Sequence, residues 1–129
     1  MRKTALTVLL ILLLAAVLAA CAPQKDPAAQ VMEAYWTALV GKQGDTLKSL
    51  SCNAWEATAV LEMDAFQSVE TKLDGLSCAK SGADGDTTLV QCQGKILATY
   101  TSEVQEYDLA DYTYQLVQQN GQWTVCGYR

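Results

Sequence analysis

The sequence predicts an α+β fold, in which N-terminal helices pack on a curved antiparallel sheet. Residues 28–40 carry large apolar side chains at spacings of three and four, the period of an amphipathic helix. From Phe66 onward the spacing changes to two, which is typical of strands, and Asn120-Gly121 is a strong signal for a hairpin turn. We therefore expect a single domain over residues 28–129.

The first helix is predicted to begin at Asp26-Pro27, with Asp26 as the N-cap and Pro27 at the first helical position. Gly41 should end it. Its buried stripe comprises Val31, Met32, Tyr35, Trp36, Leu39 and Val40.

Two shorter helices follow in the prediction. Gly44-Asp45 opens one, with Asp45 at a capping position and Leu47 and Leu50 buried. Residues 53–56 match a capping box, Asn followed three positions later by Glu, and favour a third helix that runs to about Met63.

The second half alternates as strands do. Val69, Thr71 and Leu73 share one face, and residues 87–100 form a long strand with one buried phase. Residues 112–118 and 122–128 should pair around Asn120-Gly121 as a further hairpin.

The chain begins with a short signal-like segment. A positive Met1-Arg2-Lys3 precedes an almost wholly aliphatic run, which ends in Leu18-Ala19-Ala20-Cys21. Small residues directly before a cysteine are typical of the cleavage box of a bacterial lipoprotein, so residues 1–20 are predicted to be a lipoprotein signal peptide. Cleavage would fall between Ala20 and Cys21, and Cys21 would carry the lipid.

Two placements follow from this assignment. Residues 21–27 form the lipidated cysteine and a short tether, and the domain lies outside the cytoplasm, attached by lipid to the plasma membrane or the outer membrane of a bacterium. The alternative is an uncleaved anchor over residues 4–20, which is at the short limit for spanning a bilayer. Both leave the domain on the same side of the membrane.

The net negative charge of the chain limits the classes of partner that it can bind. The full chain has nine basic and fourteen acidic residues, and loss of the signal peptide removes two of the basic ones. Such an acidic balance argues against nucleic acid, whose phosphates require clustered Lys and Arg, and against adhesion to anionic lipid.

Five cysteines become four when Cys21 is lipidated, an even number in an oxidising compartment. We expect Cys78–Cys92 and Cys52–Cys126. Turn-forming residues at 81–86 place the first pair opposite one another across a hairpin, and the second pair would tie the helical half to the last strand. No cysteine pair has Cys-x-x-Cys spacing and the chain has no histidine, so no zinc site or other cofactor is predicted.

The order of elements resembles a known architecture. The segments Tyr35-Trp36-Thr37-Ala38-Leu39, Gly44-Asp45, Tyr114-Gln115-Leu116-Val117 and Gly121-Gln122-Trp123-Thr124-Val125 look like the nuclear transport factor 2-like fold, which small bacterial lipoproteins of unknown function often resemble. The resemblance spans most of residues 28–128. It implies helices closed over a strongly curved sheet to form a cone. A cystatin-like helix-on-sheet fold is the near alternative.

The absence of histidine excludes Ser-His-Asp and Cys-His arrangements. Enzymes of the resembled fold often place an Asp inside the cone, and Asp64 beside Phe66 is the candidate here. Residues 84–86 (Asp-Gly-Asp) invite a calcium site but favour a hairpin tip. Acidic residues at Glu103, Glu106, Asp108 and Asp111 are expected in a solvated loop between strands.

The chain is rich in aromatic residues, and in a cone some of these rings would line a cavity. Ordinary core packing is the alternative for each of them. The candidate lining residues are Tyr35, Trp36, Trp55, Phe66, Tyr100, Tyr112 and Tyr114.

We expect a membrane-anchored, non-catalytic binding or interaction domain, whose partner is a small apolar ligand or an envelope protein. The open sheet face of the resembled fold also permits a dimer. The alternatives are a small ketosteroid isomerase-like enzyme that uses a pocket carboxylate, and an accessory subunit of an envelope complex.

Overall fold

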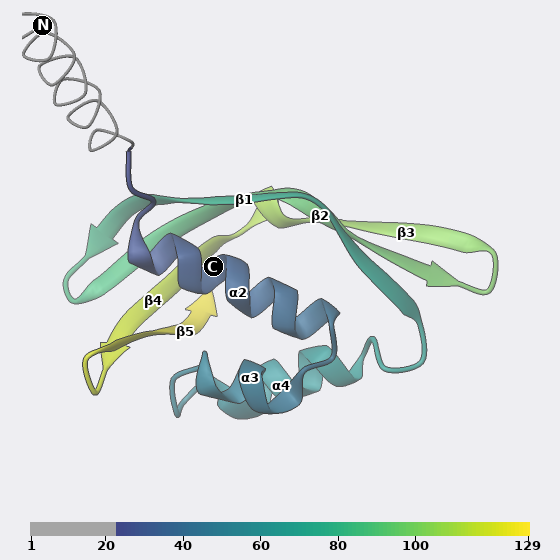
Figure 1. The fold of residues 1–129 in the computed structure, drawn as a ribbon, viewed down its shortest axis with the longest axis horizontal. Coiled ribbons are helices and arrows are strands. Elements are labelled where there is room, and N and C mark those ends of the chain that lie inside the picture. The colour runs from purple at the N-terminus through teal and green to yellow at the C-terminus, as the bar shows by residue number, and fades with distance from the viewer. Residues whose placement is uncertain (1–22) are drawn as a thin grey trace, which may run out of the picture.

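The computed structural model describes residues 23–129. The predicted signal peptide, the lipid site at Cys21 and the cleavage site at Ala20 lie outside this range. Three helices pack on one curled antiparallel sheet that forms a half-barrel, so the fold is α+β, as the sequence predicts (Figure 1).

Helix α2 (Pro27–Val40) begins as predicted. The Asp26 carboxylate accepts hydrogen bonds from the backbone N–H groups of Ala28 and Ala29, at 2.9 and 3.4 Å. Gly41 is its C-cap. The side chains that this helix buries are Ala28, Ala29, Met32, Tyr35, Trp36, Ala38 and Leu39.

Helices α3 (Gly44–Ser49) and α4 (Glu56–Asp64) are present, but their predicted caps are wrong. Asp45 lies inside the first turn of α3, and Gln43 is the N-cap. Glu56 is the first residue of α4 and not the third after a cap. The backbone N–H of Asn53 donates to the Gln119 side chain, which ties this segment to the sheet.

The sheet is organised around one long strand. Strand β2 (Thr87–Tyr100) pairs along its length with β1 (Glu70–Asp84), and the turn between them occupies Gly85 and Asp86. The other side of β2 is shared. Residues 88–91 pair with β4 (Thr113–Gln119), and residues 95–100 pair with β3 (Glu103–Asp108). Strand β5 (Gln122–Tyr128) completes the sheet beside β4.

Strand β3 was not expected from the sequence. Residues 103–108, expected as a loop, form an edge strand whose six residues are all exposed. Exposure on both faces removes the alternation of buried and polar residues by which a strand is recognised. Asp111 lies in the short 3-10 helix η2 (Leu109–Asp111) that follows.

The pairing of β1 and β2 is interrupted by a register shift where both strands carry glycines. Gly94 has φ +100° and faces a register shift between Asp74 and Ser77 of β1. A Cβ added to Gly94 would lie 2.6 Å from the Asp74 carbonyl oxygen and 2.6 Å from the Gly75 carbonyl carbon. Only glycine permits this close approach of the two backbones, which bends the strand pair over α2.

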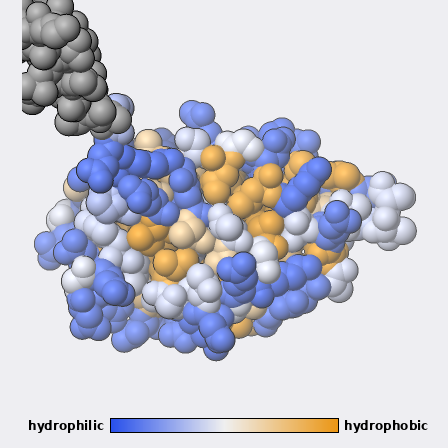
Figure 2. Space-filling view, viewed as in Figure 1, coloured by the Kyte–Doolittle hydropathy of each residue, from blue (hydrophilic) through white to orange (hydrophobic). Residues whose placement is uncertain are grey.

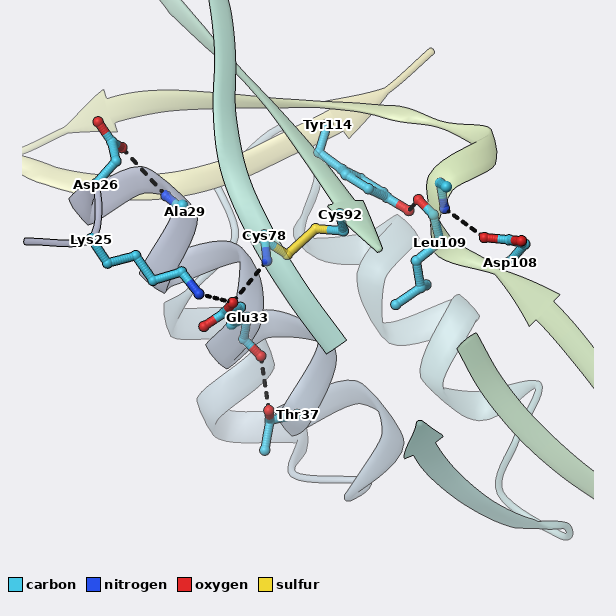
Figure 3. Close-up of a disulfide and its surroundings, with 11 residues drawn as sticks. Lys25, Asp26, Ala29, Glu33, Thr37, Cys78, Cys92, Asp108, Leu109 and Tyr114 are labelled. Atoms are coloured by element: carbon cyan, nitrogen blue, oxygen red, sulfur yellow. Dashed lines mark hydrogen bonds and ion pairs between the residues drawn. A yellow bond between two sulfur atoms is a disulfide. The ribbon is translucent and has the colours of Figure 1, made fainter. Parts of the chain in front are cut away.

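Both predicted cysteine pairs form disulfides in the structure. Cys78 and Cys92 face each other across the β1–β2 hairpin (Figure 3). Cys52 is joined to Cys126 of β5. A parallel bridge between Ser51 and Val125 lies beside the second bond. The two bonds therefore hold the helical segment and the longest hairpin to the same sheet.

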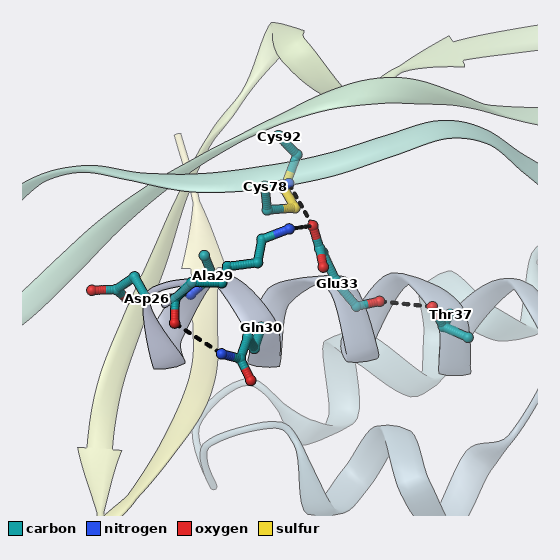
Figure 4. A network of polar contacts seen from close by, with 8 residues as sticks. Asp26, Ala29, Gln30, Glu33, Thr37, Cys78 and Cys92 are labelled. Carbon is teal, nitrogen blue, oxygen red and sulfur yellow. Dashed lines mark hydrogen bonds and ion pairs between the residues drawn. A yellow bond between two sulfur atoms is a disulfide. The ribbon is translucent and has the colours of Figure 1, made fainter. Parts of the chain in front are cut away.

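Glu33 connects the start of α2 to the first disulfide. Its carboxylate accepts hydrogen bonds from Lys25 Nζ and from the backbone N–H of Cys78, the latter at 2.8 Å (Figure 4). Partial burial opposes its ionisation, but these two donors hold the pKa of Glu33 below its ordinary value. The segment that leads out of the domain toward Cys21 is thereby fixed to the sheet.

Candidate functional site

A pocket of about 210 Å³ opens between the helices and the concave face of the sheet. Half of its twelve lining residues are aromatic, and its aliphatic members include Leu39, Ile96 and Leu109. Two carboxylates, those of Glu62 and Asp108, belong to the lining, and among the described residues no lysine or arginine does. The six aromatic residues that line it are Trp36, Phe66, Tyr107, Tyr112, Tyr114 and Tyr128.

These side chains come from every layer of the fold. Trp36 projects from α2, Glu62 from α4, and Tyr128 from the end of β5. The helical spacing of Ala59, Glu62 and Met63 places Glu62 beside the buried face of α4, and Ala59 and Met63 are core residues. The pocket therefore forms where α4 closes over the ends of β4 and β5.

Glu62 is held at the centre of a hydrogen-bond network. Tyr128 Oη donates to Glu62 Oε1 at 2.8 Å, and Tyr35 Oη donates to Glu62 Oε2 at 3.2 Å. The Trp55 indole N–H donates to Tyr35 Oη at 3.1 Å. Both oxygens of the carboxylate are therefore oriented by phenolic hydroxyl groups.

The environment of Glu62 perturbs its protonation. Burial raises the pKa of Glu62 above its ordinary value, and the hydrogen bonds from Tyr128 and Tyr35 oppose that rise only in part. The hydrogen bond to Glu62, burial and the negative charge of Glu62 raise the pKa of Tyr128 to about 12. Burial, the largest effect, and the charge of Glu62 also raise the pKa of Tyr35. Both phenols are therefore neutral hydrogen-bond donors at neutral pH.

The aromatic rings of the pocket pack on one another, Trp36 and Tyr114 edge to face and Tyr112 and Tyr128 tilted by 59°. Trp36 lies 5.5 Å from Tyr114, and Tyr128 lies 4.8 Å from Tyr112, measured between ring centroids. Tyr114 Oη donates to the Leu109 carbonyl at 2.8 Å, which fixes its ring at the pocket wall (Figure 3). The indole N–H of Trp36 is buried and has no hydrogen-bond partner among residues 23–129. The wall of the pocket therefore contains one buried N–H group without a hydrogen-bond acceptor in the described residues.

The structure brings four of the seven predicted lining residues to the pocket. They are Trp36, Phe66, Tyr112 and Tyr114. Tyr35 and Trp55 lie behind Glu62 and act on it through hydrogen bonds.

Tyr100, the remaining predicted lining residue, lies on the β2–β3 arm. Its hydroxyl is 3.3 Å from that of Tyr107, and Tyr107 itself lines the pocket.

Asp64, the predicted pocket carboxylate, is exposed at the end of α4 and does not line the pocket. Glu62 occupies the place that was expected for Asp64. Each residue of a helix is rotated by about 100° from the one before it, so side chains two positions apart lie on nearly opposite sides. Glu62 therefore faces the pocket and Asp64 faces away from it.

Residues 84–86, the candidate calcium segment, form the tip of the β1–β2 hairpin. Asp84 ends β1 and residues 85–86 form the hairpin turn. In residues 23–129 no group of three or more Asp, Glu, His or Cys side chains is placed to hold a metal ion. None of the helices in that range is both long and apolar enough to cross a bilayer.

Hydrophobic side chains reach the surface of the molecule. Figure 2 shows them across the middle of the face seen in Figure 1 and toward the β2–β3 arm, within a hydrophilic margin. Leu61 on α4 and Val104 on β3 are 70% and 57% exposed, and Tyr107, Tyr112 and Tyr128 at the pocket are 40%, 45% and 39% exposed. Three of the six pocket rings are therefore exposed to solvent, whereas Trp36 and Tyr114 are buried behind them.

Comparison with known proteins shows the fold and no family. No protein-family model matches the chain, and no curated protein matches it in sequence. The fold is similar to that of a SEC-C motif containing protein from Rhodopseudomonas palustris, with a TM-score of 0.52 and 12% identity over 81% of this chain and 80% of that one. It is also similar to Aln2 from a Streptomyces species, with a TM-score of 0.53 and 12% identity over 79% of this chain and 85% of that one. The shared feature is an α+β fold with a curled antiparallel sheet.

Proposed function

We propose that this chain is a lipid-anchored, extracytoplasmic binding protein whose nuclear transport factor 2-like cone holds a small ligand without transforming it. The aromatic pocket around Glu62 carries the proposal. It is open to solvent, mostly apolar, and includes the oriented carboxylate of Glu62, a combination that is typical of small-molecule sites.

The proposed location outside the cytoplasm is supported by observations other than the pocket. Leu18-Ala19-Ala20-Cys21 has the pattern of a lipoprotein cleavage box, and lipid on Cys21 would hold the protein at a bacterial plasma membrane or outer membrane. Two disulfides are compatible with an oxidising compartment outside the cytoplasm. The short segment between Cys21 and α2 would keep the pocket near the membrane surface.

Native mass spectrometry tests the binding function. The full chain is released in a mild detergent from the membranes of its own host and activated in the gas phase. We expect extra mass that dissociates from the lipidated protein. A clean lipidated monomer, lighter by four hydrogens for two disulfides, would contradict a stably bound ligand.

A matched pair of variants localises the ligand. Ala65 lines the pocket and is exposed, so Ala65→Trp places a large ring in the cavity without disturbing the core. Ala57 is exposed on the same helix and does not line this pocket, so Ala57→Trp is the control. The extra mass should be lost from the first variant and kept by the second.

A second candidate function is favoured by Glu62 itself. A half-buried carboxylate with a raised pKa, beside tyrosine hydroxyls, is the kind of group that a ketosteroid isomerase-like enzyme uses as a general base. Both hydroxyls are engaged with the carboxylate, however, and neither is free to stabilise an oxyanion. Proton exchange at the α-carbon of a small ketone, measured by NMR and abolished by Glu62→Gln, would establish the enzyme in place of the binding protein.

A further inference from the structure

The charges and rings of the pocket indicate which ligands it accepts. The two acidic side chains of its lining, Glu62 and Asp108, have no basic counterpart in the described lining. An anionic ligand would meet repulsion and find no charged partner, and a neutral apolar ligand would leave the Glu62 carboxylate without a counter-charge. A cation satisfies this arrangement.

The aromatic wall favours the same charge. Tyrosine, tryptophan and phenylalanine rings attract cations to their faces, and organic ammonium groups are the ligands for which aromatic cages are best suited. Here Tyr112 and Tyr128 are neighbours at 4.8 Å, and Trp36 and Tyr114 at 5.5 Å. Because Tyr128 Oη also donates to Glu62, the same residue contributes a ring and orients the carboxylate.

The volume of the pocket limits the size of the ligand. An apolar cavity of about 150 Å³ accommodates benzene, so the 210 Å³ pocket has room for roughly seven to ten non-hydrogen atoms. We propose that the pocket binds a small organic ammonium ion, its charge opposite Glu62 and its alkyl groups against the aromatic rings. This inference rests on the binding function proposed above and names the chemical class of the ligand.

The partial burial of Glu62 in the free protein supports an ammonium ligand. Desolvation raises the pKa of Glu62, which means that the ionised carboxylate has too little compensation from its surroundings. A bound ammonium ion would provide that compensation. The same chemistry is found free in solution and in lipid head groups. The lack of a basic residue in the described lining to meet a phosphate favours the free ion.

The test compares choline with its uncharged isostere 3,3-dimethylbutan-1-ol, which has the same shape and hydroxyl group. Binding to the full chain in a non-ionic detergent is measured by calorimetry. We expect choline to bind at least tenfold more tightly than the alcohol. Glu62→Gln should abolish this preference, and Asp64→Asn, which removes a charge from the exposed end of the same helix, should keep it.

A second series of variants changes the aromatic wall and leaves Glu62 in place. Tyr112 is 45% exposed, so its replacement leaves the core intact. Tyr112→Phe should retain the preference for choline, and Tyr112→Leu should reduce it severalfold, because leucine covers similar area without a π-face. Glycerophosphocholine distinguishes the source. Weaker binding than choline supports the free ammonium ion, and binding as tight as that of choline supports a lipid head group.

Equal binding of choline and the alcohol would overturn the inference while leaving the pocket as a binding site for apolar ligands. An unchanged preference in Glu62→Gln would overturn it as well. Absence of binding by either compound would also overturn it, and the Ala65→Trp comparison by mass spectrometry then decides the binding function independently.

Discussion

Removal of the Cys52–Cys126 disulfide should destabilise the domain more than removal of Cys78–Cys92, although the latter pair is the more deeply buried. The reason is the length of chain that each bond closes. The sequence separations are 74 and 14 residues. Chain entropy in the unfolded state gives about 3 kcal/mol for the shorter loop. The shorter disulfide lies inside the longer loop and reduces it to about 60 residues, which gives about 4.3 kcal/mol.

The assay is urea unfolding of two double variants, Cys52→Ala/Cys126→Ala and Cys78→Ala/Cys92→Ala, followed by far-ultraviolet circular dichroism. A domain of this size is stable by about 5–15 kcal/mol, so the first variant loses a large part of the total. The difference of about 1.3 kcal/mol between the variants corresponds to roughly 5–10 °C in Tm. A larger loss for the Cys78–Cys92 variant would refute the reasoning, because packing of two buried sulfur atoms would then outweigh chain entropy.

Three further outcomes are expected. Cys21→Ala should abolish palmitate incorporation and lipoprotein-type cleavage in the native host, and continued labelling would contradict the anchor. Gly94→Ala should lower the free energy of unfolding by roughly 3 kcal/mol or more, since its Cβ would meet backbone at 2.6 Å. Gly121→Ala, with φ +76° and open space around it, should cost only about 1 kcal/mol; equal losses in urea would show that crowding at Gly94 is not the cause. Because the pKa of Glu62 is raised on folding, the folded state binds that proton more tightly than the unfolded state does. The stability of the wild type relative to Glu62→Gln should therefore fall as pH rises from the ordinary value of 4.5 through the raised pKa, and a flat difference across pH 4–8 would contradict the assignment.

The local signals in the sequence were sufficient for most of the fold. Asp26 and Pro27 start α2 where their chemistry predicts, and Asn120 and Gly121 adopt the positive φ values, +53° and +76°, of the expected tight turn. The predicted cap of α4 failed where a tertiary contact competes with the local preference. The backbone of Asn53, for example, is bound to the Gln119 side chain.

The site was harder to predict because its register depends on a bulge. The turn at Asn120-Gly121 pairs Gln119 with Gln122 and Leu116 with Val125. Continued regularly, that register would set Tyr114 opposite Gly127. A register shift between Tyr114 and Leu116 sets it opposite Tyr128 instead and brings the two rings to one face. Gly127, with φ +132°, lies in β5 at this shift, and a glycine inside a strand is a sequence signal for a bulge that the prediction did not use. Helical spacing from Ala59 and Met63 was a signal that could have identified Glu62.

The pocket shows where the fold departs from what stability alone would favour. An ionised Glu62 in a half-buried apolar setting costs free energy, since burial raises its pKa, and the buried Trp36 N–H has no partner among residues 23–129. A leucine and a phenylalanine at these two positions would fill similar space without either cost. The two unfavourable groups belong to the lining of the same pocket, which is open to solvent and carries six aromatic rings. Local departures of this kind gather where a protein meets its ligand, and a bound ammonium ion would relieve the first of them directly.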